Sequence, residues 1–162
     1  MKQAKEIAEA EHAEVIRLTA EITRLNLSKL SGIGIADSSA VFGSNEGPSE
    51  GESGKKTVRY NKDGDLGHIG AYISGNSQIE ENKSITMEVN MNIKPRTLTF
   101  FYENKEQSVS VRNIPPSIRF YIYLYYPNST FIITKFENVQ CSSAKGGIKG
   151  QRILEWGKEW KK

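Results

Sequence analysis

Hydrophobic and polar residues alternate along most of the chain after residue 57. Met87 and Val89 alternate with polar neighbours in the segment 85–91, and Leu98 and Phe100 repeat the pattern in 96–102. Such alternation is typical of a β-strand that buries one face. The same reasoning predicts further strands at 33–35, 57–60, 109–111, 118–126 and 130–137. Short polar turns join these segments without an intervening helix, so the sequence predicts a mainly β protein built as an antiparallel β-sandwich.

The alternation also predicts which side chains meet inside the sandwich. On each strand the apolar residues two positions apart share one face, and this face is expected to turn toward the opposite sheet. The predicted core comprises Met87, Val89, Leu98, Phe100, Phe120, Ile122, Leu124 and Phe131.

The first thirty residues follow another pattern. Val15, Leu18, Ile22 and Leu25 recur at spacings of three and four, which predicts an N-terminal α-helix over residues 1–30 with one apolar stripe. Two destinations for this stripe stay open. It packs on the sheet of its own chain, or it pairs with a second copy as a short coiled coil and gives a weak homodimer.

The remaining chain divides into three parts by composition. Residues 31–140 hold the predicted strands and form the expected sandwich domain. Within it, residues 43–56 contain Gly, Ser, Glu and Pro without an apolar member, so a mobile loop that buries nothing is expected. Residues 141–162 form a C-terminal tail, in which Trp156 and Trp160 are expected to pack back on the domain.

The composition of the chain limits the cellular compartments and the classes of partner that we expect. The chain of 162 residues has 22 basic and 19 acidic side chains spread along it, so it lacks the clustered charge of a nucleic-acid binder. It has neither an apolar run of about 18 residues nor the apolar stretch of a signal peptide. We therefore expect a cytoplasmic protein, with a nuclear location left open, that binds neither nucleic acid nor membrane. Cys141 is the single cysteine and allows no internal disulfide.

Candidate catalytic chemistry is sparse. His68 is the one histidine of the predicted sheet region, and a structural role is expected because no nucleophile accompanies it. Glu88 lies where a sandwich glycosidase would carry paired carboxylates, but Asn90 and Asn92 follow, and amides cannot act as acid or nucleophile. The sequence therefore predicts no enzyme, no catalytic residue, no cofactor and no metal site.

Several segments, in order, resemble the B30.2/SPRY family. They include Gly32-Ile-Gly-Ile-Ala-Asp37, Thr57-Val-Arg-Tyr-Asn61, Ile85-Thr-Met-Glu-Val89, Leu98-Thr-Phe-Phe101 and Ile114-Pro-Pro-Ser-Ile-Arg-Phe120. The chain looks most like the divergent protozoan branch, in which a coiled coil often precedes the domain. The resemblance implies a bent, concanavalin-like sandwich that binds peptides or proteins through loops at one end. Complete members begin with strands ahead of the Gly-Ile-Gly segment, so the sandwich is expected to be incomplete at its front.

The predicted function is a non-catalytic protein-interaction module with a protein or peptide partner. Loops and one aromatic strand face supply the candidate binding residues, because Tyr and Arg are enriched in protein interfaces. These are Asn61, Asp63, Asp65, Asn104, Lys105, Arg119, Tyr121, Tyr123, Tyr125 and Asn128. Two alternatives stay open: a truncated paralogue that binds nothing, and a lectin-like carbohydrate binder.

Overall fold

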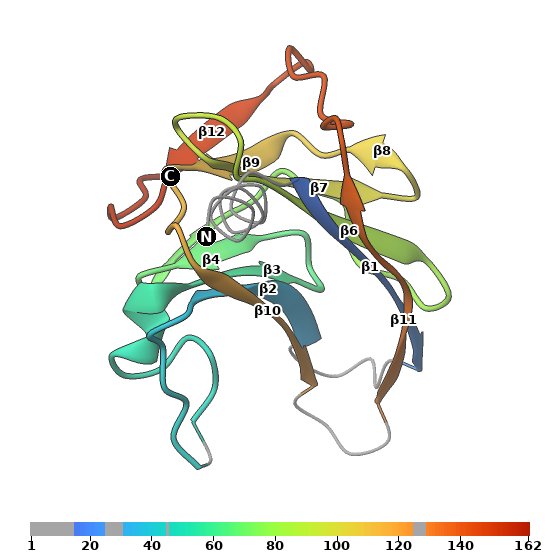
Figure 1. The fold of residues 1–162 in the computed structure, drawn as a ribbon. Coiled ribbons are helices and arrows are strands. Elements are labelled where there is room, and N and C mark those ends of the chain that lie inside the picture. Colours follow the sequence, from blue (N-terminus) through green and yellow to red (C-terminus); the bar gives the residue numbers. More distant parts are fainter. Residues whose placement is uncertain (1–14, 25–30, 45, 125–128) are drawn as a thin grey trace, which may run out of the picture.

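The computed structural model describes residues 15–24, 31–44, 46–124 and 129–162, and these form two stacked β-sheets (Figure 1). The larger sheet has the order β11-β1-β6-β7-β9-β12, with β8 beside β7. Its strands are β1 (Val15–Arg24), β6 (Ser84–Asn90), β7 (Thr97–Tyr102), β8 (Lys105–Glu106), β9 (Val109–Arg112), β11 (Thr130–Val139) and β12 (Arg152–Glu155).

The smaller sheet has the order β10-β2-β3-β4-β5. Its strands are β10 (Ile118–Leu124), β2 (Ser31–Asp37), β3 (Thr57–Asn61), β4 (Leu66–His68) and β5 (Ala71–Ile73). Neighbouring strands are antiparallel in both sheets, apart from the parallel pair β9–β12. The predicted β-sandwich is thereby confirmed as an architecture of two mostly antiparallel sheets.

The core lies between the sheets, and half of its predicted members are fully buried. Met87, Val89, Leu98 and Phe100 are inaccessible to solvent, and the Phe100 ring meets Tyr60 of the other sheet edge-on at 5.2 Å. The β10 residues Phe120, Ile122 and Leu124 are only partly buried. Phe131 was predicted to be buried and is 39% exposed. It belongs to β11, which, like β10, is the last strand of its sheet and has a neighbour on one side only.

The predicted helix over residues 1–30 is wrong for residues 15–24, which form β1 between β6 and β11; its other residues lie outside the described ranges. Leu18 and Ala20 belong to the core cluster, while Arg17 and Thr19 face the other way. This is a period of two, and β-branched residues at 15, 16 and 19 favour a strand over a helix. Because Val15 and Leu18 are already buried in this chain, they cannot form a seam with a second copy.

Two further expectations need correction. Residues 43–56 were expected to bury nothing, but Pro48, Ser53 and Gly54 are buried, and a 3-10 helix spans Ser53–Lys56. This segment is held by hydrogen bonds to its backbone and not by apolar side chains. For example, the Thr57 hydroxyl donates to the Pro48 carbonyl at 2.6 Å. The tail is also not separate from the sandwich, since β12 extends the larger sheet.

The tail packs back as expected, without forming a helix. Trp156 and Trp160 place their rings 5.0 Å from the His68 ring. Both nitrogens of His68 are occupied, since Nδ1 donates to the Thr57 carbonyl at 2.7 Å and Nε2 accepts from the Gly157 N–H at 2.8 Å. His68 is thus a buried side chain that links β4 to the tail. In the part of the chain that the structure describes, no helix is long and apolar enough to cross a membrane.

Candidate binding pocket on the larger sheet

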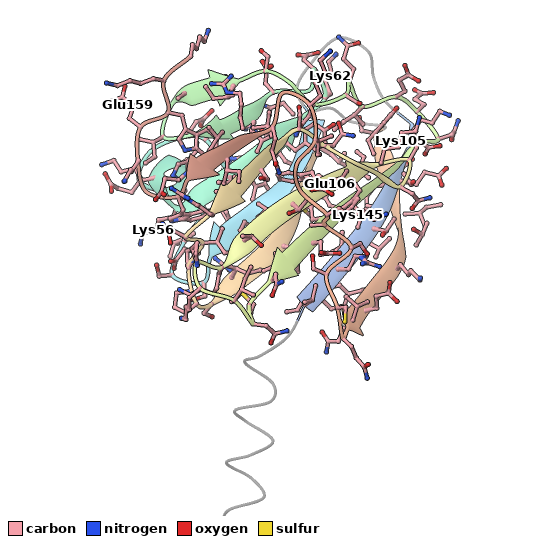
Figure 2. All side chains as sticks on the ribbon, turned by 90° about the horizontal axis from the view of Figure 1, so that it is seen from above. Lys56, Lys62, Lys105, Glu106, Lys145 and Glu159 are labelled. Atoms are coloured by element: carbon pink, nitrogen blue, oxygen red, sulfur yellow. The ribbon has the colours of Figure 1, made fainter. Side chains whose placement is uncertain are left out.

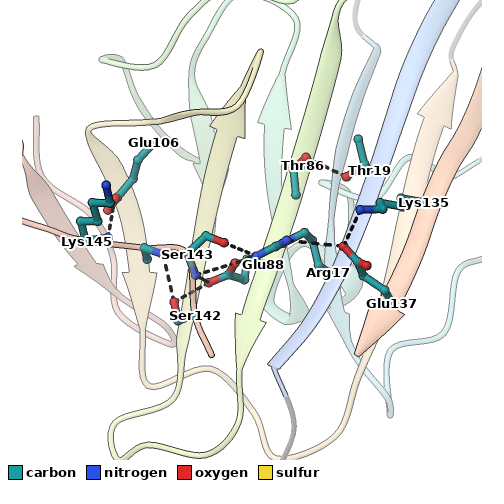
Figure 3. A network of polar contacts seen from close by, with 11 residues as sticks. Arg17, Thr19, Thr86, Glu88, Glu106, Lys135, Glu137, Ser142, Ser143 and Lys145 are labelled. Atoms are coloured by element: carbon teal, nitrogen blue, oxygen red, sulfur yellow. Dashed lines mark hydrogen bonds and ion pairs between the residues drawn. The ribbon is translucent and has the colours of Figure 1, made fainter. Parts of the chain in front are cut away.

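Polar side chains gather on the outer face of the larger sheet, where β11, β1, β6 and β7 run side by side (Figure 3). The strand register places them in two rows. Arg17 of β1 lies between Glu137 of β11 and Glu88 of β6. In the next outward-facing row, Thr19 lies between Lys135 and Thr86. Since neighbours in a row interact across strands, the register alone brings opposite charges and hydroxyls together.

Glu88 is the buried anchor of this face, with only 1% of its surface exposed. Its carboxylate accepts hydrogen bonds from Arg17 Nη2 at 2.7 Å and Nε at 3.2 Å. The Ser142 hydroxyl and the Ser143 N–H, the latter at 3.0 Å, donate to it from the opposite side. Burial alone would raise the pKa of Glu88, but the bonds from Ser142 and Arg17 outweigh it and the pKa is lowered. Glu88 therefore stays ionised and holds Arg17 in place.

The beginning of the C-terminal tail forms one wall beside this face. Besides the two serines on Glu88, the Glu106 carboxylate of β8 accepts the Lys145 N–H at 2.7 Å and the Gly146 N–H at 3.1 Å. Gly146 and Gly147 both adopt φ of +64°, a conformation that suits glycine. The carboxylates of Glu88 and Glu106 thus hold the segment 142–146 against the outer face of the larger sheet, with Lys145 beside Glu106 (Figures 2 and 3).

Between the wall and β11 lies a pocket of about 320 Å³. This volume is at the lower end of the range for small-ligand sites. Its walls are hydroxyls, an amide, charged groups and one aromatic ring, contributed by Arg17, Thr19, Thr86, Phe101, Asn104, Lys135, Glu137, Ser143 and Lys145. The Thr19 and Thr86 hydroxyls bond each other at 2.8 Å on the floor.

Basic groups outnumber acidic ones on the pocket walls. Lys135 pairs with Glu137 at 3.3 Å, and Arg17 reaches the same carboxylate at 3.4 Å. The Lys145 ammonium has no ion pair within 4.0 Å among the residues that the structure describes. With Arg17 already satisfied by Glu88, one carboxylate faces two lysines, so the pocket carries a local excess of positive charge.

Of the predicted binding residues that the structure describes, Asn104 alone lines this pocket. It is one of two residues at the tip of the β7–β8 hairpin, where Glu103 has φ of +48° and Asn104 has φ of +63°. A tight hairpin turn needs positive φ at both central positions, and asparagine tolerates it well. Lys105, which follows, is exposed in β8 at the same end of the molecule (Figure 2).

Six further predicted residues that the structure describes lie on strands of the smaller sheet or in the turn after β3, and they do not line the pocket. Asn61 is buried, while Asp63 is exposed and Asp65 half-buried in the following turn. On β10, the Tyr121 ring lies 6.1 Å from that of Phe42, its hydroxyl donates to the Val58 carbonyl at 3.2 Å, and burial raises its pKa.

Arg119 of β10 also contacts the segment before residue 43, because it donates to the Ala40 carbonyl and lies 5.9 Å from the Phe42 ring. Tyr123, a half-buried neighbour on the same strand, has interactions of its own. Tyr125 and Asn128 lie outside the described residues. Among the described residues of this row, Arg119 and Tyr121 thus contact the segment that holds Ala40 and Phe42, and Arg119 is still exposed.

Several pocket residues escaped the sequence analysis. Arg17 was assigned to a helix, and Ser143, Lys135 and Lys145 carried no motif. Their proximity depends on strands far apart in the chain, such as β1 and β11, and on the path of the tail. Glu88 was examined only as a glycosidase carboxylate, and its lowered pKa is opposite to what a general acid requires.

Within residues 15–24, 31–44, 46–124 and 129–162, no three His, Cys, Asp or Glu side chains lie together as metal ligands would. No protein-family model matches the chain, and no curated protein matches it. The resemblance to the B30.2/SPRY family therefore stays a prediction.

Proposed function

We propose that this chain is a non-catalytic protein-interaction module, and that the pocket on the larger sheet binds an acidic segment of a partner polypeptide. The observation that carries the proposal is the charge balance of the pocket. Lys135 and Lys145 line it with a single carboxylate, Glu137, while Arg17 is paired with Glu88, and Lys145 has no ion pair among the described residues. An acidic side chain entering the pocket would be attracted by this excess and would meet hydroxyl and amide donors.

The rigidity of the pocket supports a binding role. The Glu88–Arg17 pair and the two serines fix the floor and the wall before any ligand arrives. A preformed site loses less side-chain entropy on binding than a flexible one, and this favours affinity. The resemblance to a peptide-binding family agrees with a polypeptide partner.

A protein ligand suits the pocket better than a carbohydrate. Sugar binding usually relies on an exposed aromatic ring, which presents its face to the apolar side of the sugar. Phe101, the aromatic residue of the pocket, is only 7% exposed. The pocket instead offers short polar donors and lysines, which recognise carboxylates.

The proposal is tested with a fluorescein-labelled peptide of alternating Glu and Gly, and a Lys–Gly peptide as the opposite charge. Fluorescence anisotropy should detect binding of the acidic peptide and none of the basic one. The double variant Lys135→Glu/Lys145→Glu should weaken binding about tenfold or more, corresponding to about 1.4 kcal/mol. Since exposed charges are screened by salt, affinity should also fall as ionic strength rises.

The matched control is Lys94→Glu/Lys161→Glu, which changes the net charge equally at exposed lysines outside the pocket. It should bind within about twofold of the wild type if the site is specific, a difference of roughly 0.4 kcal/mol. Equal loss in both double variants would show attraction by net charge alone. Absence of binding to the acidic peptide by a folded wild-type chain would refute the proposal and favour a chain without binding activity.

A further inference from the structure

Arg59 of β3 is a buried cation on the outer face of the smaller sheet, with 4% of its surface exposed. In the strand register it lies between Gly34 of β2 and Gly67 of β4. Tyr121 and Tyr72 stand in the next positions of this row and lie over the two glycines. A Cβ at Gly34 would come within 2.7 Å of the Tyr121 hydroxyl, so the arrangement requires glycine there.

The guanidinium of Arg59 has neutral partners only. Nη1 donates to the Ser49 hydroxyl and Nη2 to the Tyr72 hydroxyl, both at 3.2 Å, while Nε has no hydrogen-bond partner. Among the described residues no carboxylate lies within 4.0 Å of it. An unpaired buried charge costs several kcal/mol, so a compensating negative charge is expected.

Neighbouring titratable groups do not supply that charge. Burial raises the pKa of Tyr121, although nearby Arg59 opposes the shift, so this hydroxyl is protonated at neutral pH. His68 is neutral, since Nδ1 donates to a carbonyl, Nε2 accepts an N–H and burial lowers its pKa. In the covering segment, Glu52 pairs with Lys55, and the Glu50 carboxylate accepts the Gly47 N–H.

Beside Arg59 lies a small cavity, lined among others by Ser49, Thr57 and Tyr72 and by three glycines, Gly54, Gly67 and Gly70. Its volume is about 10 Å³, which is room for one water-sized sphere. The Ser49 and Tyr72 hydroxyls accept from Arg59, so their own protons are free to donate into this space. Arg59 Nε–H is a third available donor.

We propose that this cavity binds one monovalent anion of chloride size as the counter-charge of Arg59. Two hydroxyl-bearing side chains and the buried cation Arg59 line this space, and its small volume suits a single-atom ligand. A carboxylate or a phosphate is too large for it. A water molecule would fit, but it would leave the charge of the guanidinium without compensation.

The first test locates the anion directly. Crystals of the full chain soaked in sodium bromide should show one anomalous peak within hydrogen-bonding distance of Arg59 Nε. The same soak of Arg59→Gln should show none there. A cavity without anomalous signal in the wild type would overturn the proposal and assign the space to water.

The second test measures linkage in solution. At constant ionic strength, replacing gluconate with chloride should raise the melting temperature of the wild type in a saturable manner, because a ligand bound to the folded state stabilises it. Arg59→Gln should lose this dependence. The control Arg152→Gln, at an exposed arginine, should keep it. Equal responses of both variants to chloride would contradict a site at Arg59.

A third variant keeps the proposal testable if Arg59→Gln fails to fold. Tyr72→Phe retains the arginine and the half-exposed ring but removes one donor. Losing one hydrogen bond to a charged ligand weakens its binding, so the chloride concentration at half-saturation should rise about tenfold or more. An unchanged half-saturation point would exclude the Tyr72 hydroxyl and, with it, the proposed donor set.

Discussion

The two flanks of the sandwich differ sharply in how their apolar residues are covered. On the closed flank, where β4 meets the tail, the rings of Trp156 and Trp160 both contact His68, and Trp160 is buried. The open flank is where the edge strands β10 and β11 face each other (Figure 1). Side chains of these strands line two grooves there, of about 230 and 130 Å³. There Phe136 remains 65% exposed, although its ring touches Phe120 at 5.9 Å.

Both flanks are rich in apolar side chains, so local composition does not explain the difference. The closed flank receives its cover from a segment about ninety residues away, as the bond from the Gly157 N–H to His68 shows. Among the described residues, the inner face of β11 is covered only in part, by side chains of β10 such as Phe120. Burial thus depends on whether a distant part of the chain returns to the same place, and the following experiments test this dependence.

The largest effect is expected at the centre of the core. Phe100→Ala should lower the free energy of unfolding by about 3–5 kcal/mol, since it removes a fully buried ring and leaves a cavity. Urea denaturation followed by circular dichroism measures this change. A loss below about 1 kcal/mol would mean that the sheets collapse onto the space, and that the core is less tightly packed than its burial indicates.

Glu88→Gln comes next, because it keeps the shape of the side chain and removes the charge that holds Arg17. We expect a loss of about 1.5–3 kcal/mol at pH 7, the range for hydrogen bonds to charged groups, whereas exposed Glu159→Gln should change little. The pKa of Glu88 is lowered from 4.5, so its contribution is complete above this value and disappears as the pH falls through the lowered pKa. The difference in the free energy of unfolding between variant and wild type should therefore disappear in acid. A difference that does not change with pH would show that the charge of Glu88 is not its source.

His68 should make the closed flank sensitive to mild acid. Burial lowers its pKa below 6.5, so the unfolded chain binds a proton more readily than the folded one. The free energy of unfolding should then fall as the pH drops below about 6.5, by at most about 1.4 kcal/mol per pH unit. Chemical denaturation at pH 7.5 and 5.5 measures it. His12→Gln should retain this slope and His68→Asn should lose it; a slope that persists in His68→Asn would assign it to another group.

The smallest effect is expected on the open flank. Phe136→Ala should cost less than about 1 kcal/mol, because most of the ring is already in water. It should also reduce binding of the dye ANS, which reports exposed apolar surface. A loss as large as that of Phe100→Ala would show that another segment covers β11 in solution, and the contrast between the flanks would disappear.

The sequence predicted the strands of the central hairpins because their alternation is local. β6, β7 and β9 occur close to the expected positions, and Met87, Val89, Leu98 and Phe100 face inward as predicted. The method failed for β1. Its positions at 15, 18 and 22 also fit a helical spacing, and only pairing with β6 and β11 selects the strand.

The candidate pocket was mostly beyond sequence reasoning. Asn104 was predicted from its turn. Arg17 and Lys135, however, lie more than a hundred residues apart in the sequence, and Lys145 comes close to them only because the tail folds back beside the sheet. Cross-strand neighbours are determined by register, and register between distant strands is not encoded in any short motif. The contacts of Arg119 and Tyr121 with the segment holding Ala40 and Phe42 depend on distant parts of the chain in the same way; their role in binding stays a prediction.

The sequence by itself determined where the strands of the central hairpins, β6, β7 and β9, form and which face of each is apolar, because both depend on neighbours within a few residues. The tertiary structure alone decided which faces are covered, which charges become partners and where a cation is left without one. Those outcomes depend on which segments, distant from one another in the sequence, pack together in the fold. Phe100 and Phe136 have the same side chain and lie in similar alternating strands, and only the packing of distant segments makes one fully buried and the other largely exposed.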